Sequence, residues 1–122
     1  MIENAVLSNT TADVFMAPGT PGDLNAQSAI TTMIFCNTGA PNPADETENA
    51  ATVNIYIVKD GQTADPAVNA VVQNLVIPAG DTLFFDTERL VLASGDSIAA
   101  DATFPNPSGT QNIIATVSVL PV

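Results

Sequence analysis

LVIPAGDTLFFDTERLVLASGDSIAADA, residues 75–102, contains two Gly-Asp pairs, Gly80-Asp81 and Gly95-Asp96, that lie 15 positions apart. Each pair follows an apolar run and precedes a segment in which apolar and polar residues alternate. Short antiparallel strands that are joined by tight turns have this pattern. Because no catalytic side chains gather around the turns, the stretch indicates a building block rather than an enzyme.

Segments of strand length recur along the rest of the chain. The expected strands are Ala5–Ser8, Val14–Ala17, Gln27–Thr38, Thr52–Lys59, Val68–Ile77, Thr82–Asp86, Val91–Ala93, Ser97–Thr103 and Ile113–Val119. The first two are expected to form a hairpin, and Thr87–Leu90 a single helical turn. No segment keeps a 3.6-residue period for three turns. We therefore predict an all-β protein, with residues 1–122 forming a single antiparallel β-sandwich of about eight strands, either immunoglobulin-like or jelly-roll.

The alternation within the strands predicts which side chains form the core. The residues expected to face inward are Ile30, Ile34, Val53, Ile55, Ile57, Val72, Leu83, Phe85, Ile98, Ile113, Val117 and Val119. The strand Gln27–Thr38 has apolar residues on both faces, which is typical of a central strand or of one covered on its outer side. Met33 and Phe35, together with Phe84 and Leu120, are expected on outer faces, where assembly would bury them.

The charge balance excludes some classes of partner. The chain has 13 acidic residues against only Lys59 and Arg89, for a formal net charge of −11. Nucleic-acid binding and attraction to an anionic membrane both need clustered lysine and arginine, so neither partner is expected. The acidity favours solubility and resistance to non-specific association. The alternative is that an acidic face docks on a basic partner.

The chain offers few residues for chemistry. It has no histidine, and Cys36 is its single cysteine, which we expect to be a buried structural thiol. Asp13, Asp23, Asp60, Asp81 and Asp96 are interpreted as turn or cap residues. The loop Asp45–Glu48 could hold calcium through its oxygens, although a solvated charge cluster is the favoured interpretation. We thus expect no enzyme activity and no catalytic, cofactor-binding or metal-binding residues.

Arg89 is singled out because it is one of two cations and lies between the two Gly-Asp turns. The favoured interpretation is that it orients the turn or contacts another subunit. The start of the chain lacks the basic region and apolar core of a signal peptide, and no apolar run is long enough for a transmembrane helix. We therefore expect synthesis in a cytoplasm.

Three segments carry a resemblance to a known family. ITTMIFCNT (residues 30–38), VNIYIVKDG (residues 53–61) and IPAGDTLFFDTERLVLASGDSIAADA (residues 77–102) resemble small structural proteins of tailed bacteriophages, particularly those of marine cyanobacteria. The shared features are a strand that ends near Cys-Asn-Thr, a P-A-G-D-T turn and an L-x-x-G-D-x-I segment. The resemblance implies a β-sandwich subunit of the virion.

This resemblance and the composition together favour one function and leave alternatives. We expect a capsid decoration subunit that forms a homo-oligomer and contacts other virion proteins. A neck, tail or baseplate component is the first alternative. A host-facing adhesion or carbohydrate-binding module is the second, and it predicts that Pro18–Asn25, Gly39–Asn49 and Phe104–Gln111 cluster at one end of the sandwich.

Overall fold

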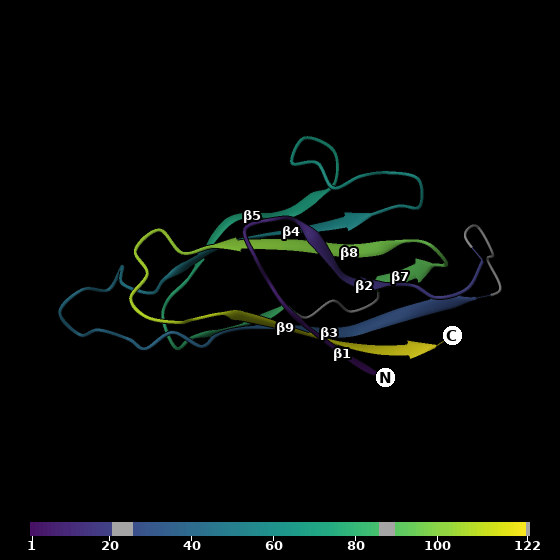
Figure 1. The fold of residues 1–122 in the computed structure, drawn as a ribbon. Coiled ribbons are helices and arrows are strands. Elements are labelled where there is room, and N and C mark those ends of the chain that lie inside the picture. The colour runs from purple at the N-terminus through teal and green to yellow at the C-terminus, as the bar shows by residue number, and fades with distance from the viewer. Residues whose placement is uncertain (21–25, 86–89, 122) are drawn as a thin grey trace.

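The computed structural model describes residues 1–20, 26–85 and 90–121 and shows two antiparallel sheets that pack face to face. All regular elements in these ranges are strands, namely β1 (Ile2–Val6), β2 (Ala12–Met16), β3 (Gln27–Asn37), β4 (Ala51–Val58), β5 (Ala70–Ile77), β6 (Thr82–Phe85), β7 (Leu90–Ala93), β8 (Ser97–Thr103) and β9 (Ile113–Pro121). Figure 1 shows the sheets as two layers, with both chain ends at the same end of the molecule. Nowhere in the described ranges does the chain form a helix that could traverse a lipid bilayer.

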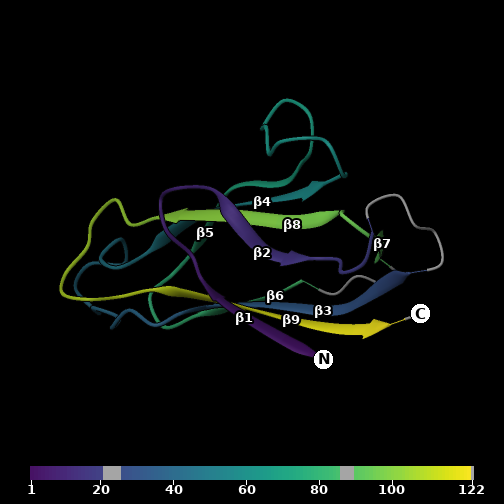
Figure 2. The ribbon, with the colours of Figure 1, turned by 45° about the vertical axis from the view of Figure 1, so that its right-hand side comes forward.

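The strand order is that of a jelly roll. One sheet has the order β1-β9-β3-β6, with β7 also paired to β3, and the other has the order β2-β8-β4-β5. Since β6 and β7 pair with different parts of β3, they occupy one interrupted strand position. The immunoglobulin order would place the first strand beside the second, whereas here β1 lies beside the last strand, β9 (Figure 2). The β-sandwich prediction is therefore confirmed, and the jelly-roll alternative is the one observed.

The expected hairpin near the N-terminus is wrong. β1 pairs with β9, but β2 pairs with β8 in the opposite sheet, so the chain crosses between layers over residues 7–11. Leu7 is buried in the core at this crossing. Polar turn residues between two apolar segments do not reveal whether the strands pair with each other or with distant partners. The expected helical turn at Thr87–Leu90 falls mainly on residues outside the described ranges.

A β-bulge in β3 decides which residues of that strand face inward. Ile30 is opposite Val119 and Thr32 is opposite Ser118, so Thr31 is an extra residue without a counterpart in β9. The Thr31 hydroxyl donates a hydrogen bond to the Ser118 carbonyl, 3.2 Å away. Because one extra residue reverses the alternation, even-numbered residues face inward before the bulge and odd-numbered residues face inward after it.

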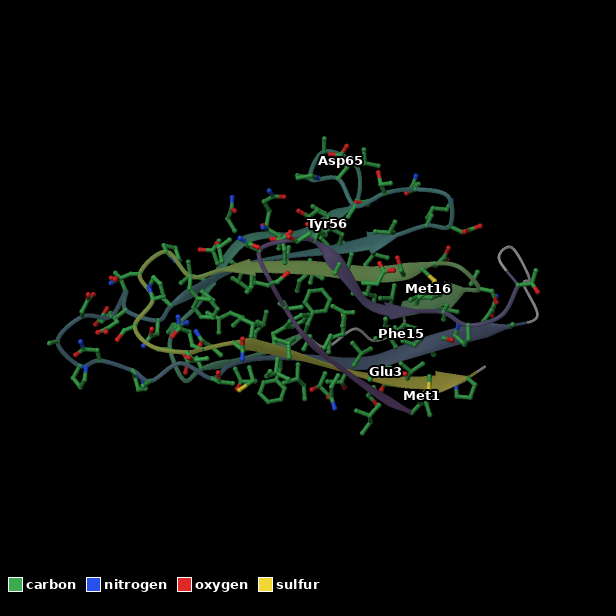
Figure 3. All side chains as sticks on the ribbon, in the orientation of Figure 1. Met1, Glu3, Phe15, Met16, Tyr56 and Asp65 are labelled. Carbon is green, nitrogen blue, oxygen red and sulfur yellow. The ribbon has the colours of Figure 1, made fainter. Side chains whose placement is uncertain are left out.

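The core follows this corrected alternation. Of the predicted core residues, those buried are Ile30, Val53, Ile55, Ile98, Ile113, Val117 and Val119, and those partly buried against the core are Ile57, Val72, Leu83 and Phe85. Ile34 was predicted inward, but the bulge turns it to the outer side. Met33 and Phe35 were predicted on an outer face, and both are 0% exposed in the core. Phe15 also contributes from β2, between the layers (Figure 3).

The two Gly-Asp turns have the same geometry, as their sequence predicts. The Asp81 amide donates to the Pro78 carbonyl at 3.0 Å, and the Asp96 amide donates to the Ala93 carbonyl at 3.0 Å. The third residue of each turn is a glycine with positive φ, 77° for Gly80 and 92° for Gly95. An L-residue rarely adopts this conformation, which is why glycine occupies both positions.

The bulge predicts stability losses of different size for two neighbouring alanine substitutions. Met33→Ala should lower the free energy of unfolding by about 2–5 kcal/mol, because it empties a fully buried site. Ile34→Ala should lower it by roughly 1 kcal/mol, because Ile34 is only half-buried and lies on the outer face. Urea denaturation of both variants measures the difference. A larger loss for Ile34→Ala would contradict the bulged register.

Candidate functional site

Of the acidic residues expected in turns, Asp60, Asp81 and Asp96 lie there, and the carboxylate of Asp96 has hydrogen-bond partners. The Asp96 carboxylate accepts hydrogen bonds from the backbone amides of Asp60, at 2.9 Å, and Ala93, at 3.1 Å. Asp60 itself lies in the turn after β4. Asp13 contradicts the prediction because it lies within β2, and Asp23 is outside the described residues. Among the residues that the structure describes, no group of three or more His, Cys, Asp or Glu side chains is arranged to hold a metal ion.

The acidic loop between β3 and β4 uses its oxygens internally. One Asp45 oxygen accepts hydrogen bonds from the Thr47 amide at 3.0 Å and the Thr47 hydroxyl at 2.7 Å, and the other accepts from the Asn106 amide group at 3.2 Å. The bonds from Thr47, followed by the bond from Asn106, lower the pKa of Asp45. The Glu48 carboxylate accepts a hydrogen bond from Asn42.

Among the residues that the structure describes, the strands of the five-stranded sheet have no charged side chain on their outer face, which we call the neutral face. Residues paired across strands share a face, and the register gives its members as Ile2, Asn4, Val6, Gln27, Ala29, Thr32, Ile34, Cys36, Thr82, Phe84, Val91, Ala93, Ile114, Thr116, Ser118 and Leu120. None of these residues is charged, although the chain carries a net charge of −11. Glu3 in β1 is paired with buried Val117 and so lies on the other side of the strand. Figure 3 shows this face below the lower layer.

The neutral face contains two of the predicted interface residues. Phe84 is 63% exposed and Leu120 is 56% exposed, and both lie on it. Met33 and Phe35 are incorrect as interface residues because they are fully buried between the sheets. Arg89 falls outside the described residues. Cys36 was expected to be buried, but it is half-buried and belongs to the neutral face.

A second candidate surface is a groove at one end of the sandwich, with a volume of about 800 Å³. The loop between β3 and β4, the turn between β5 and β6, and the loop between β8 and β9 supply most of its lining. The lining residues are Pro41, Asn42, Pro43, Glu46, Thr47, Glu48, Ala50, Thr52, Val76, Pro78, Ala79, Pro105 and Asn106. We call it the proline groove, because four prolines line it and apolar side chains form most of its surface.

Two asparagines hold the loops around the proline groove. Asn37 is 1% exposed. Its side-chain amide group donates to the backbone carbonyls of Asn49 at 2.8 Å and Ile77 at 2.9 Å. Its side-chain oxygen accepts from the backbone amide of Gly39 at 2.8 Å. Asn49 bonds to the loop between β8 and β9. Its backbone amide donates to the Asn106 carbonyl at 2.9 Å, and its side-chain oxygen accepts from the Ser108 amide at 2.7 Å. Neither asparagine is predicted from the sequence to hold these loops.

The predicted cluster of three end loops is only partly correct. Gly39–Asn49 and Phe104–Gln111 lie together at the groove end, where Asn106 contacts Asp45. Pro18 lies at the opposite end instead, where its carbonyl accepts a 2.8 Å hydrogen bond from buried Ser94. Residues 21–25 of the third loop are outside the described ranges. The turn between β5 and β6, which the prediction omitted, completes the groove.

A buried polar cluster on the outer face of the other sheet joins β8 to β4 and to the connection between β1 and β2. Asp101 is 8% exposed and accepts hydrogen bonds from Thr11 and Asn54, both at 2.7 Å. Tyr56 is 4% exposed and lies beneath the loop that carries Asp65 (Figure 3). Burial raises the pKa of Tyr56, and the charge of Asp101 and its hydrogen bond with the hydroxyl raise it further. These groups are mutually satisfied, which favours a structural role.

The buried amide of Asn37 predicts a large stability loss on its removal. Asn37→Ala should lower the free energy of unfolding by about 3 kcal/mol or more, because each buried backbone group left unpaired costs roughly 1–3 kcal/mol. Asn4→Ala on the neutral face should change it by less than about 0.5 kcal/mol. Chemical denaturation measures both. Equal effects of the two substitutions would show that Asn37 does not hold the loops.

The raised pKa of Tyr56 predicts a loss of stability at alkaline pH. In the unfolded chain the phenol ionises near its usual pKa of about 10, whereas in the folded chain it ionises only at higher pH. Its contribution is therefore complete below about pH 10 and is lost as the pH rises toward the folded pKa.

Two measurements test this pH dependence. Tyr56 is the only tyrosine, so the ultraviolet absorbance of tyrosinate during a pH titration reports its pKa directly. Denaturation of wild type and Tyr56→Phe should show a steeper alkaline loss for the wild type. A titration midpoint at or below the usual value of about 10 would contradict the burial of the hydroxyl.

No family model, curated protein or solved structure matches the chain. Jelly rolls carry many unrelated functions, so the fold does not decide among them. The neutral face and the proline groove are the two features of this chain from which a function can be inferred.

Proposed function

We propose that the protein is a structural subunit of a tailed-bacteriophage virion, namely a capsid decoration subunit that forms a homo-oligomer. The observation that carries the assembly role is the neutral face: an exposed, largely apolar and uncharged sheet surface on an otherwise acidic protein. Exposed apolar patches of this kind mark interaction sites. The phage setting rests on the resemblance of residues 30–38, 53–61 and 77–102.

The dimensions of the neutral face suit a contact between subunits. It spans four strand positions about 4.8 Å apart, and strands of nine to eleven residues extend roughly 30 Å, so its area is roughly 600 Å². A specific interface buries about 800 Å² per partner, and side chains at the rim add to the flat area. The face is thus large enough for one symmetric contact.

The distribution of charge favours a second copy of the chain as the partner on this face. If two neutral faces meet, no carboxylate of the described residues has to leave water, and the acidic loops stay hydrated. A strongly basic partner would gain nothing from a face without charges. Two acidic copies repel at long range, so salt should strengthen this self-association by screening the repulsion.

The remaining parts of the proposal concern location and partners. The subunit is made in the host cytoplasm and acts in the virion, where it contacts other virion proteins rather than nucleic acid or membrane. It has no catalytic role and needs no cofactor. A neck, tail or baseplate position is the alternative within the same class, because assembly through the neutral face fits each of them.

A host-facing adhesion or carbohydrate-binding module is the alternative from another class. The meeting of Gly39–Asn49 and Phe104–Gln111 at one end favours it, since sandwich domains often bind ligands through end loops. Against it, the proline groove has no aromatic side chain among its lining residues on which a sugar ring could stack. Binding of a glycan on an array at micromolar strength would favour this module over the structural subunit.

The neutral face predicts that one charged substitution disrupts assembly. Phe84→Asp should weaken self-association at least about 30-fold, or about 2 kcal/mol, because it buries a carboxylate at the contact. Val68→Asp is the matched control: Val68 is 64% exposed against 63% for Phe84, but it lies in the loop over the other sheet. Light scattering coupled to size-exclusion chromatography measures the assembly state.

Two outcomes would overturn parts of the proposal. A wild type that stays monomeric at about millimolar concentration would refute assembly through the neutral face. For the virion role, mass spectrometry of purified particles and binding to expanded capsids are decisive. Binding to capsids that is lost in the Phe84→Asp variant supports the decoration role. Detection of the protein in isolated tails supports the neck, tail or baseplate alternative. Absence of the protein from purified virions refutes both.

A further inference from the structure

The proline groove differs from the neutral face in both shape and charge. It is concave, whereas the neutral face is an open sheet surface. Its charged lining residues are Glu46 and Glu48, and no lysine or arginine of the described ranges lines it. Both carboxylates belong to the loop between β3 and β4 and lie beside the apolar surface that Pro41 and Pro43 contribute.

The walls of the groove are held in place before any partner arrives. The hydrogen bonds of Asn37 and Asn49 tie the loop between β3 and β4 to the end of β5 and to the loop between β8 and β9. Asn106 adds bonds to Asp45 and Thr47, both at 3.2 Å. Prolines restrict the backbone further because their φ is fixed. A preformed groove binds with a smaller loss of conformational entropy than a loose one.

We propose that the proline groove binds an extended segment of a different protein that carries a large apolar side chain beside lysine or arginine. The apolar side chain packs between the prolines and against Val76, and the cation faces Glu46 and Glu48. This assignment follows from charge complementarity, since an apolar floor with only acidic charges favours an apolar segment with basic neighbours.

The partner is not a second copy of this chain. The only cations of the chain are Lys59 and Arg89, and each has an acidic neighbour in the sequence, Asp60 and Glu88. Such segments would bring carboxylates toward Glu46 and Glu48. The groove therefore provides a contact with a different protein, and this inference rests on the groove alone rather than on the neutral face.

Three synthetic peptides test the proposed chemistry. The probe is Gly-Ser-Arg-Trp-Arg-Ser-Gly, with Gly-Ser-Arg-Ser-Arg-Ser-Gly lacking the apolar anchor and Gly-Ser-Glu-Trp-Glu-Ser-Gly reversing the charge. Titrations followed by amide chemical shifts should show the first peptide perturbing Thr52, Val76 and Ala79. The other two should bind at least about tenfold more weakly, since each loses one of the two recognition elements. Equal binding of all three would overturn the proposal.

Matched variants locate the contact. Glu46→Lys should weaken binding of the Arg-Trp-Arg peptide at least about tenfold, and Val76→Trp should do the same by filling the groove. Glu3→Lys is the control for net charge, since Glu3 is also exposed but lies in β1, away from the groove. Equal losses for Glu46→Lys and Glu3→Lys would refute the groove as the binding site. An unchanged thermal midpoint for each variant shows that folding is intact.

The response to salt separates this inference from the proposed function. Added sodium chloride should weaken the peptide contact by screening its attraction, but strengthen self-association through the neutral face by screening repulsion. The inference would be overturned if the Arg-Trp-Arg peptide does not bind at about millimolar concentration. It would also be overturned if a glycan, instead of the peptide, changes the amide chemical shifts of the groove. Self-association, measured separately, would be unaffected by either result.

Discussion

The bulge at Thr31 is the constraint on which most of the structure depends. β3 is the central strand of its sheet and pairs with β9, β6 and β7. By reversing the alternation, the bulge places Met33 and Phe35 in the core. It also turns Ile34 and Cys36 outward, where they join the neutral face, and brings Asn37 inward beneath the loops. A regular strand with the same sequence would exchange these roles.

The two candidate surfaces follow from how charge is distributed over this framework. Most of the described acidic residues lie in loops and turns, where backbone and side-chain donors accommodate them, as Asp45 and Asp96 show. Glu3, Asp13 and Asp101 lie in strands instead. The strands of the five-stranded sheet keep their outer face free of charge. Because the protein has a net charge of −11, we expect salt to strengthen the proposed contact between two copies and to weaken the proposed contact with a basic partner. One surface suits an identical acidic subunit, and the other suits a basic partner.

Turn chemistry positions the proline groove without contributing reactive groups. Pro78 and Ala79 line the groove because the Gly80-Asp81 turn directs the chain from one sheet to the other at that end. The groove then depends on Asn37, whose buried amide group donates to two backbone carbonyls, and on Asn49, which bonds to the loop between β8 and β9. The asparagines hold three chain segments together, so the groove is a product of the folded chain rather than of any one loop.

The sequence by itself determined most of the strands, the two Gly-Asp turns and the sandwich class, because alternation and turn residues act over a few neighbouring positions. It placed the first strand wrongly, at Ala5–Ser8 instead of Ile2–Val6. It also located Phe84 and Leu120 on a surface. Only the tertiary structure decided that β1 and β2 join different sheets, that Thr31 bulges and that Gly39–Asn49 meets Phe104–Gln111. These features depend on pairing between residues far apart in the chain. In β3 both faces are apolar, so the sequence does not show at which residue the inward and outward positions are exchanged. The register against β9 shows that the exchange occurs at Thr31.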